Sequence, residues 1–122
     1  MATVVIASSA RADLAEVLSW SGVQFGPVVR QAYAGLVAQV LQDLASLPPT
    51  FRREDGIFEG CLLYHLSWSL TRARTIRGLK LSTARHFAVC ELHGDELRVL
   101  AVVHDSRDVP RFARERLGLE AP

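Results

Sequence analysis

The stretch Arg85–Asp108, RHFAVCELHGDELRVLAVVHDSRD, decides the fold of this chain. It contains two apolar runs, Phe87–Leu92 and Leu97–Val103, separated by His-Gly-Asp-Glu. A short break containing glycine between two β-rich runs predicts an antiparallel hairpin. The second run is apolar at nearly every position, which is typical of a strand covered on both faces. We therefore expect Leu97–Val103 to be a central strand of a sheet.

Charged side chains follow directly after the second run. His104, Asp105, Arg107 and Asp108 lie at its exit, where a buried strand would deliver polar groups to the rim of a sheet. Such a rim is one way to build a functional edge. The alternative is a strand end followed by the solvated start of a helix, and the residue types alone leave both interpretations open.

Upstream of the hairpin, the sequence predicts a strand and a first helix. Thr3–Ala7 is a β-branched run, and Ser8 and Ser9 offer hydroxyls that can cap a helix. Apolar residues at helical spacing place this helix at about residues 10–21. Gly22 fits its C-terminal end.

The second helix is the strongest helix prediction in the chain. Gly26-Pro27 opens it, because proline is tolerated at the first helical position. From there an apolar stripe recurs at intervals of three and four residues up to Leu44, and few charges precede Pro48-Pro49. More than one face of this helix must therefore be covered, either by the domain itself or in part by a partner's helix.

The remaining segments predict one more strand, two loops and a terminal helix. Residues 48–55 are expected to form a polar loop and Ile57–Trp68 a second strand. Ser69–Ala84 is basic and has no clean period, so we expect a long, partly flexible loop. Pro110 predicts the first turn of a helix that runs to about Leu117 and ends at Gly118. The expected fold class is α+β, in the order β-α-α-β-β-β-α, with a helical hairpin packed on a mostly antiparallel sheet.

The size and composition exclude several classes of protein. A chain of 122 residues that is 49% hydrophobic and 22% charged is expected to form one domain with one core. No apolar stretch approaches the roughly 18 residues of a membrane span, and the N-terminus lacks a signal-like pattern. We expect no membrane association and a cytoplasmic location.

The positive charge is concentrated in one segment. The chain carries a net charge of +1, yet Gly60–Cys90 contains no acid and five cations. The net charge of the rest of the chain is therefore −4. The five cations are Arg72, Arg74, Arg77, Lys80 and Arg85.

Neither a metal site nor a cofactor site is predicted. The four histidines, His65, His86, His93 and His104, fall on separate elements without metal-ligand spacing. Cys61 and Cys90 form no Cys-x-x-Cys motif and are expected to be buried, reduced thiols. The chain also lacks a glycine-rich phosphate loop and a Gly-x-Ser-x-Gly elbow, so we expect no cofactor.

In their order and spacing, these segments resemble the RelE/ParE toxin superfamily. Its members are the toxin halves of bacterial type II toxin–antitoxin pairs, often described as plasmid stabilisation proteins. The resemblance implies a single toxin domain over residues 1–122, with an N-terminal strand, a helical hairpin, an antiparallel sheet and a short C-terminal helix. The segments that carry it are Ala10–Leu14, Phe25-Gly26, Leu44–Pro48, Gly60–Leu66 and Arg85–Arg111.

Within the superfamily, the chain looks more like the ParE branch. Leu63–Leu66, Arg85-His86 and His104–Asp108 are the segments similar to that branch, whose members poison DNA gyrase and are not known to be hydrolases. The resemblance thus implies a gyrase inhibitor held inactive by a cognate antitoxin, and we expect a homodimer or a heterotetramer with the antitoxin. One departure is Cys90-Glu91, where the family usually has Tyr-Arg, so an inactive remnant that acts only as a binding module is a third alternative.

A RelE-like, metal-independent endoribonuclease acting on ribosome-bound mRNA is the alternative function. Arg85 could hold the phosphate, His104 could act as base or acid, and Arg107 could stabilise the developing charge. RelE-like nucleases often carry a Tyr near the C-terminal end, and here no Tyr follows His104. Asp105 and Asp108 flank Arg107 and would repel an RNA phosphate.

The resemblance also implies two sets of contact residues. An antitoxin helix laid against the second helix of the hairpin would bring its acids to the basic segment. The candidate antitoxin contacts are Trp20, Phe25, Val29, Tyr33, Leu36 and Val40. The candidate target contacts are Arg72, Arg74, Arg77, Lys80, Arg85, His104 and Arg107.

Overall fold

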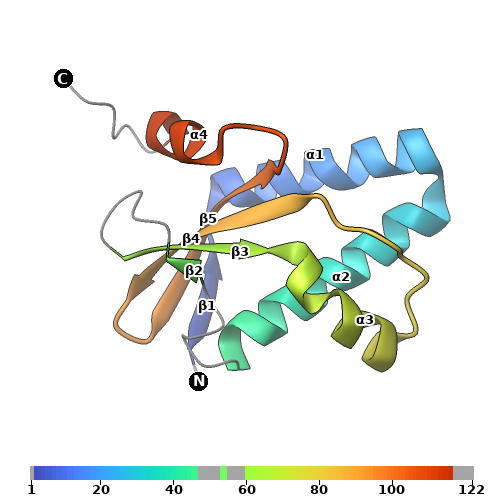
Figure 1. The fold of residues 1–122 in the computed structure, drawn as a ribbon, viewed down its shortest axis with the longest axis horizontal. Coiled ribbons are helices and arrows are strands. Elements are labelled where there is room, and N and C mark those ends of the chain that lie inside the picture. The colour runs from blue at the N-terminus through green and yellow to red at the C-terminus, as the bar shows by residue number, and fades with distance from the viewer. Residues whose placement is uncertain (1, 47–52, 55–59, 117–122) are drawn as a thin grey trace.

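The computed structural model describes residues 2–46, 53–54 and 60–116. It has the α+β fold expected from the sequence, with a helical hairpin lying against a sheet (Figure 1). None of the helices described is long and apolar enough to cross a membrane. In chain order the elements are β1 (Thr3–Ile6), α1 (Ser8–Phe25), α2 (Pro27–Ser46), β2 (Arg53–Glu54), β3 (Cys61–His65), a 3-10 helix (Leu66–Ser69), α3 (Leu70–Arg77), β4 (His86–His93), β5 (Glu96–His104) and α4 (Val109–Arg116).

The predicted hairpin is confirmed and forms the middle of the sheet. The strand order is β1-β5-β4-β3-β2, with β1 parallel to β5 and the other neighbours antiparallel. In the β4/β5 hairpin His93 pairs with Glu96 at the turn and His86 with His104 at the open end. Gly94 has φ 58° in the turn, a left-handed conformation that glycine adopts without steric cost. Since β5 has a strand on each side, it is interior as expected.

Each face of the sheet is covered by different helices. On one face α1 and α2 pack over Leu97 and Val99 of β5, and on the other α4 packs over Ala101 and Val103. Leu97 and Val99 point to one face and Ala101 and Val103 to the other because a β-bulge lies between the two pairs. At this bulge Val89 pairs with Ala101, whereas its neighbour Cys90 pairs with Val99. The extra residue, Leu100, therefore turns Ala101 and Val103 to the face opposite Leu97 and Val99.

The first helix is longer than the sequence predicts. The helix expected at residues 10–21 continues through Gly22 to Phe25, and Gly26, with φ 90°, follows its last residue. The prediction that Gly22 ends the helix was therefore wrong. A Cβ at Gly22 would lie 3.0 Å from Cδ of Arg30, so a glycine here allows α1 and α2 to approach closely.

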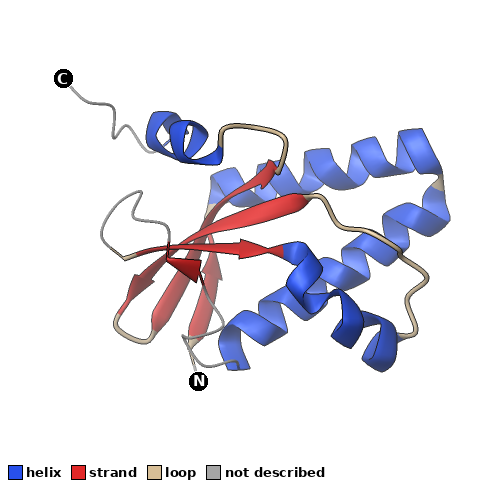
Figure 2. Cartoon of the chain, viewed as in Figure 1, coloured by secondary structure: helices blue, strands red, loops and turns tan. Residues whose placement is uncertain are grey.

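The region expected to be a strand and a long loop contains two helices that the sequence did not predict, the 3-10 helix and α3. The strand expected at 57–68 is limited to β3 among the described residues, and residues 57–59 lie outside them. The loop expected at 69–84 contains α3, which Figure 2 shows against the lower helix of the hairpin. Within the loop expected at 48–55, Arg53–Glu54 forms the short edge strand β2.

Helix α4 confirms the predicted terminal helix. The predicted end of that helix at Gly118 lies outside the described residues.

Candidate functional site

Three histidines meet at one end of the sheet. His65 ends β3, His86 begins β4 and His104 ends β5. Because these three neighbouring strands are antiparallel, the end of β3, the start of β4 and the end of β5 lie at the same edge. We call His65, Arg85, His86, His104 and Asp105 the histidine edge.

Asp105 is the acceptor that connects this edge. Its carboxylate accepts a hydrogen bond from Nε2 of His65 at 3.0 Å and one from Nε of Arg85 at 3.2 Å. Nδ1 of His104 lies 3.7 Å from the same carboxylate. Burial pushes the pKa of Asp105 upward, but the hydrogen bonds from His65 and Arg85 outweigh it and hold the pKa below its usual value. Asp105 is therefore an anion that offsets the charge of Arg85 at neutral pH.

Backbone hydrogen bonds fix the orientation of two of the rings. Nδ1 of His65 accepts from the N–H of Ser67 at 3.1 Å, and Nδ1 of His104 accepts from the N–H of Ser106 at 3.1 Å. In each neutral ring the proton therefore resides on Nε2, which in His65 donates to Asp105. The histidine edge is preorganised by its own backbone.

His86 is the buried member of the edge and is paired with a residue of α2. The hydroxyl of Tyr33 and Nδ1 of His86 lie 2.6 Å apart. Burial, with a further contribution from the repulsion of His104, lowers the pKa of His86 to about 4. Burial also raises the pKa of Tyr33 to about 12. Both groups are therefore uncharged at neutral pH.

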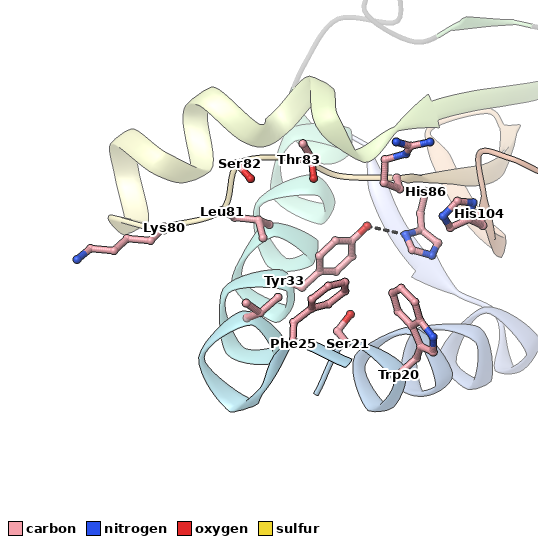
Figure 3. A pocket seen from close by; sticks show the side chains of 12 residues that line it. Trp20, Ser21, Phe25, Tyr33, Lys80, Leu81, Ser82, Thr83, His86 and His104 are labelled. Atoms are coloured by element: carbon pink, nitrogen blue, oxygen red, sulfur yellow. Dashed lines mark hydrogen bonds between the residues drawn. The ribbon is translucent and has the colours of Figure 1, made fainter. Parts of the chain in front are cut away.

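A pocket of about 290 Å³ lies between the histidine edge and the helical hairpin. We call it the hairpin pocket. Trp20 and Phe25 meet edge to face there, with ring centroids 5.5 Å apart. Figure 3 shows His86 and His104 at one end of the pocket, and Lys80 extending outward at the other. Its lining comprises Trp20, Ser21, Phe25, Val29, Tyr33, Lys80, Leu81, Ser82, Thr83, Arg85, His86 and His104. It thus combines an apolar hairpin side with a polar end that contains Arg85.

The structure divides the predicted antitoxin contacts into two groups. Trp20, Phe25, Val29 and Tyr33 line the hairpin pocket. Leu36 and Val40 are 0% and 2% exposed, because they pack against the sheet within the domain's own core. The prediction that Leu36 and Val40 contact an antitoxin was therefore wrong. The alternative, that the domain itself covers these two residues, is correct.

The first part of the predicted basic loop is the helix α3, which is held in place by its arginines. Arg72 donates to Asp43 of α2 at 3.0 Å, and Arg77 donates to Gln39 at 3.1 Å. Arg74 instead donates to the backbone carbonyls of Leu81 and Ser82. These three side chains join α3 to its neighbours, so they are not a freely solvated cationic loop.

Arg85 and Arg107 lie on different sides of His104. Arg85 lines the hairpin pocket, whereas Arg107 lines a second pocket of about 360 Å³ on the α4 side. There the guanidinium of Arg107 lies 5.4 Å from the ring centroid of Phe112. His104 lines both pockets. The three residues considered for RNA cleavage therefore do not converge on one pocket.

Three members of the histidine edge were absent from the predicted contacts: His65, His86 and Asp105. The signal that could have found them is the register of the sheet, which pairs His65 with Phe87 and His86 with His104, and places Asp105 one residue beyond His104. A sequence pattern alone does not provide that register. Among the described residues, no group of three or more His, Cys, Asp or Glu is arranged to hold a metal ion.

The attachment of α3 to α2 gives a first testable prediction. Asp43 is 3% exposed and accepts hydrogen bonds from Gln39 and Arg72, each at 3.0 Å. Asp43→Ala removes the acceptor for both donors and should lower the free energy of unfolding by about 1–3 kcal/mol. Amide hydrogen exchange of α3 should accelerate as well. The exposed Gln31→Ala on the same helix is the control, and equal exchange in both variants would contradict this account.

Comparisons with known proteins agree with this fold. The ParE toxin of the type II toxin–antitoxin system parDE is the family whose model matches residues 4–109, which span β1 to the first residue of α4. Among solved structures, a chain of the chromosomal ParDE toxin–antitoxin system from P. aeruginosa is similar with a TM-score of 0.62. It is 15% identical in sequence, and the match covers 85% of this chain and 96% of that chain, a likeness that shows the fold. A search of curated proteins found no match. Since the family match covers most of the sequence, the chain belongs to the ParE toxin family of type II toxin–antitoxin systems.

Proposed function

We propose that this ParE-family protein inhibits DNA gyrase by binding it, and that a cognate antitoxin neutralises it through the helical hairpin. It would act in the cytoplasm, where gyrase and its DNA are found. The proposed target contacts are Lys80, Arg85, His104 and Arg107, because the other predicted cations are engaged in holding α3. Exposed arginines are frequent in energetically dominant interface contacts.

The position of Asp105 is the single observation that carries this proposal over RNA cleavage. Its carboxylate lies between His65 and Arg85 and 3.7 Å from His104. A site that cleaves RNA must attract a phosphate and stabilise additional negative charge. An anion held among the same side chains opposes both requirements. A protein surface, by contrast, can satisfy a mixed pattern of Arg, His and Asp.

At Cys90, the departure from the family pattern does not argue for an inactive remnant. Cys90 is 0% exposed and belongs to the core on the α1/α2 face of the sheet. A substitution at that position changes internal packing and leaves the outer surface of the toxin as it is. Glu91, its neighbour, lies on β4 near the turn of the hairpin, at the end of the strand opposite His86.

Two parallel assays test the function. The purified chain should abolish supercoiling by gyrase while mRNA in a translating extract, read by primer extension, stays intact. Arg85→Gln should raise the concentration needed for half inhibition about tenfold, the effect of losing one important contact. Arg114→Gln, an exposed cation on α4, is the matched control. Cut mRNA with normal supercoiling would overturn the proposal.

His104→Ala separates a contact from a catalytic group. A contact residue should weaken inhibition by about tenfold or less. A general acid or base should instead lose about two to four orders of magnitude of cleavage rate. The same variant tested in both assays therefore assigns the role of His104, and a large loss of cleavage would place the protein among the nucleases.

A further inference from the structure

Arg85 and Asp105 are held side by side by the register of the β4/β5 hairpin. His86 pairs with His104 at its open end, so the residues one position beyond, Arg85 and Asp105, are neighbours across the two chains. The backbone N–H of Asp105 donates to the carbonyl of Arg85 at 2.8 Å. Their side chains meet as well, since Nε of Arg85 donates to Oδ1 of Asp105 at 3.2 Å. Backbone and side-chain contacts thus join one cation to one anion.

The second oxygen of the Asp105 carboxylate is occupied by His65. Nε2 of His65 donates to Oδ2 of Asp105 at 3.0 Å. The orientation of the His65 ring is fixed, because its Nδ1 accepts from the N–H of Ser67 at 3.1 Å at the start of the 3-10 helix. Both carboxylate oxygens therefore have a donor. Asp105 cannot turn away from Arg85 without also leaving His65 without its acceptor.

The guanidinium of Arg85 remains accessible although Asp105 offsets its charge. The side chain is 63% exposed, and its bond to Asp105 uses the Nε–H. The N–H donors on the two terminal nitrogens are left for other acceptors. Any acceptor that binds them lies next to the Asp105 carboxylate. That anion repels a phosphate or a carboxylate, whereas an uncharged carbonyl meets only the donors.

We propose that Asp105 determines the specificity of the histidine edge: it holds Arg85 as a hydrogen-bond donor whose charge is offset, so the edge binds uncharged acceptors of a protein and rejects phosphate. The acceptors that fit are backbone carbonyls and side-chain amides. Asp105 acts through Arg85 and is therefore a positioning residue. This inference rests on the proposed binding of a protein target and names the chemistry that the target must present at this edge.

Removal of this one negative charge should convert the edge into an anion site. Arg85 would then be an exposed cation beside His65 and His104, whose Nε2–H groups are further donors. Asp105→Asn is the suitable variant, because asparagine has the size of aspartate and its amide oxygen still accepts a hydrogen bond from Arg85 or His65. The variant thus changes the charge of the edge and keeps its shape.

A labelled oligothymidylate measures whether the edge admits phosphate. This single strand lacks the 2′-hydroxyl, so a nuclease that depends on that group cannot cut it. Its binding to the full-length chain at pH 7.5 is followed by fluorescence anisotropy. Asp105→Asn should tighten binding about threefold to tenfold at low salt, because the repulsion of phosphate is removed. The slope of log K against log salt should steepen by about 0.7, the contribution of one phosphate contact to a single strand.

Two further variants show whether the gain belongs to Arg85. Asp95→Asn removes one negative charge from the exposed turn at the opposite end of the hairpin, so it should stay within about twofold of the wild type. Arg85→Gln combined with Asp105→Asn should return the affinity to the wild-type value, since the new phosphate contact uses Arg85. Equal gains in Asp95→Asn and Asp105→Asn, or a gain that persists without Arg85, would overturn the proposal.

Binding to purified gyrase without DNA tests whether the role of Asp105 is merely structural. A loosened edge would weaken binding of both gyrase and oligothymidylate. The proposal expects opposite changes, so Asp105→Asn should bind gyrase about threefold to tenfold more weakly while it binds the strand more tightly. A loss of both affinities would contradict it. If the wild type did not bind gyrase but the oligothymidylate results held, the proposed function would fail and the rejection of phosphate would stand. If the wild type bound gyrase and Asp105→Asn gained no affinity for the strand, this inference alone would fail.

Discussion

Replacing Asp13 with alanine should lower the free energy of unfolding by about 2–4 kcal/mol, because this side chain completes the sheet and holds α4. Strand β1 pairs with β5 only as far as Ile6 and Val99, while β5 continues to His104. Beyond that point Asp13, which is 8% exposed, accepts the N–H of Val102 at 3.0 Å. Without the carboxylate, that buried backbone donor loses its acceptor.

The same carboxylate binds the last residue of α4. Arg116 donates through Nη1 and Nη2 to the two oxygens of Asp13, at 3.1 and 3.0 Å. Its guanidinium also lies 4.9 Å from the ring centroid of Phe112. A bidentate arginine pair is geometrically specific as well as strong. Asp13 thus joins α1, β5 and α4, which are distant in sequence.

Denaturant unfolding at pH 7 measures this effect, with two comparison variants. Asp13→Asn keeps an acceptor for Val102 but removes the charge that binds Arg116, so its loss should be about half that of alanine. Glu16→Ala, an exposed acid on the same helix, should change stability by less than about 0.5 kcal/mol. An alanine variant at position 13 as stable as the one at position 16 would show that the sheet and α4 do not depend on this carboxylate.

The regular parts of the fold could be predicted because local patterns determine them. Helix α2 shows its apolar stripe at helical spacing, and the β4/β5 hairpin shows two apolar runs around Gly94. Helix α3 could not be predicted, because it buries only two of its own residues, Leu70 and Ala73. Its stability comes from arginine contacts with α2 and the following loop, which no local pattern records.

The site was only partly predictable for a related reason. Periodicity marked one stripe on α2, but it could not say which part of that stripe the domain itself covers. Leu36 and Val40 face the sheet, whereas Val29 and Tyr33 of the same stripe reach the pocket. Asp105 was seen in the sequence as an acid that repels phosphate. Its function as the common acceptor of His65 and Arg85 depends on the register of three strands.

His86 should make the stability of this protein fall as the pH decreases from about 6.5 to about 4. In the unfolded chain a histidine has a pKa of about 6.5, whereas burial lowers the pKa of His86 to about 4 in the folded state. Above pH 6.5 the ring is neutral in both states and the native state has its full stability. Between the two values the unfolded state binds a proton that the folded state does not, so stability is lost as the pH falls.

The size of this effect follows from the difference between the two pKa values. One pKa unit corresponds to about 1.4 kcal/mol, so the loss attributable to His86 should approach about 3 kcal/mol at pH 4. Urea unfolding of the wild type and of His86→Gln from pH 7.5 to 4 measures this loss of stability, as the difference between the pH dependences of the two proteins.

Tyr33→Phe is the matched control: it removes the hydroxyl 2.6 Å from Nδ1 of His86 but leaves the ring of His86 buried. Because burial is the main cause of the shift, Tyr33→Phe should be less stable than the wild type at every pH yet keep the same pH dependence. If His86→Gln lost as much stability on acidification as the wild type, the buried ring could not be the group that titrates.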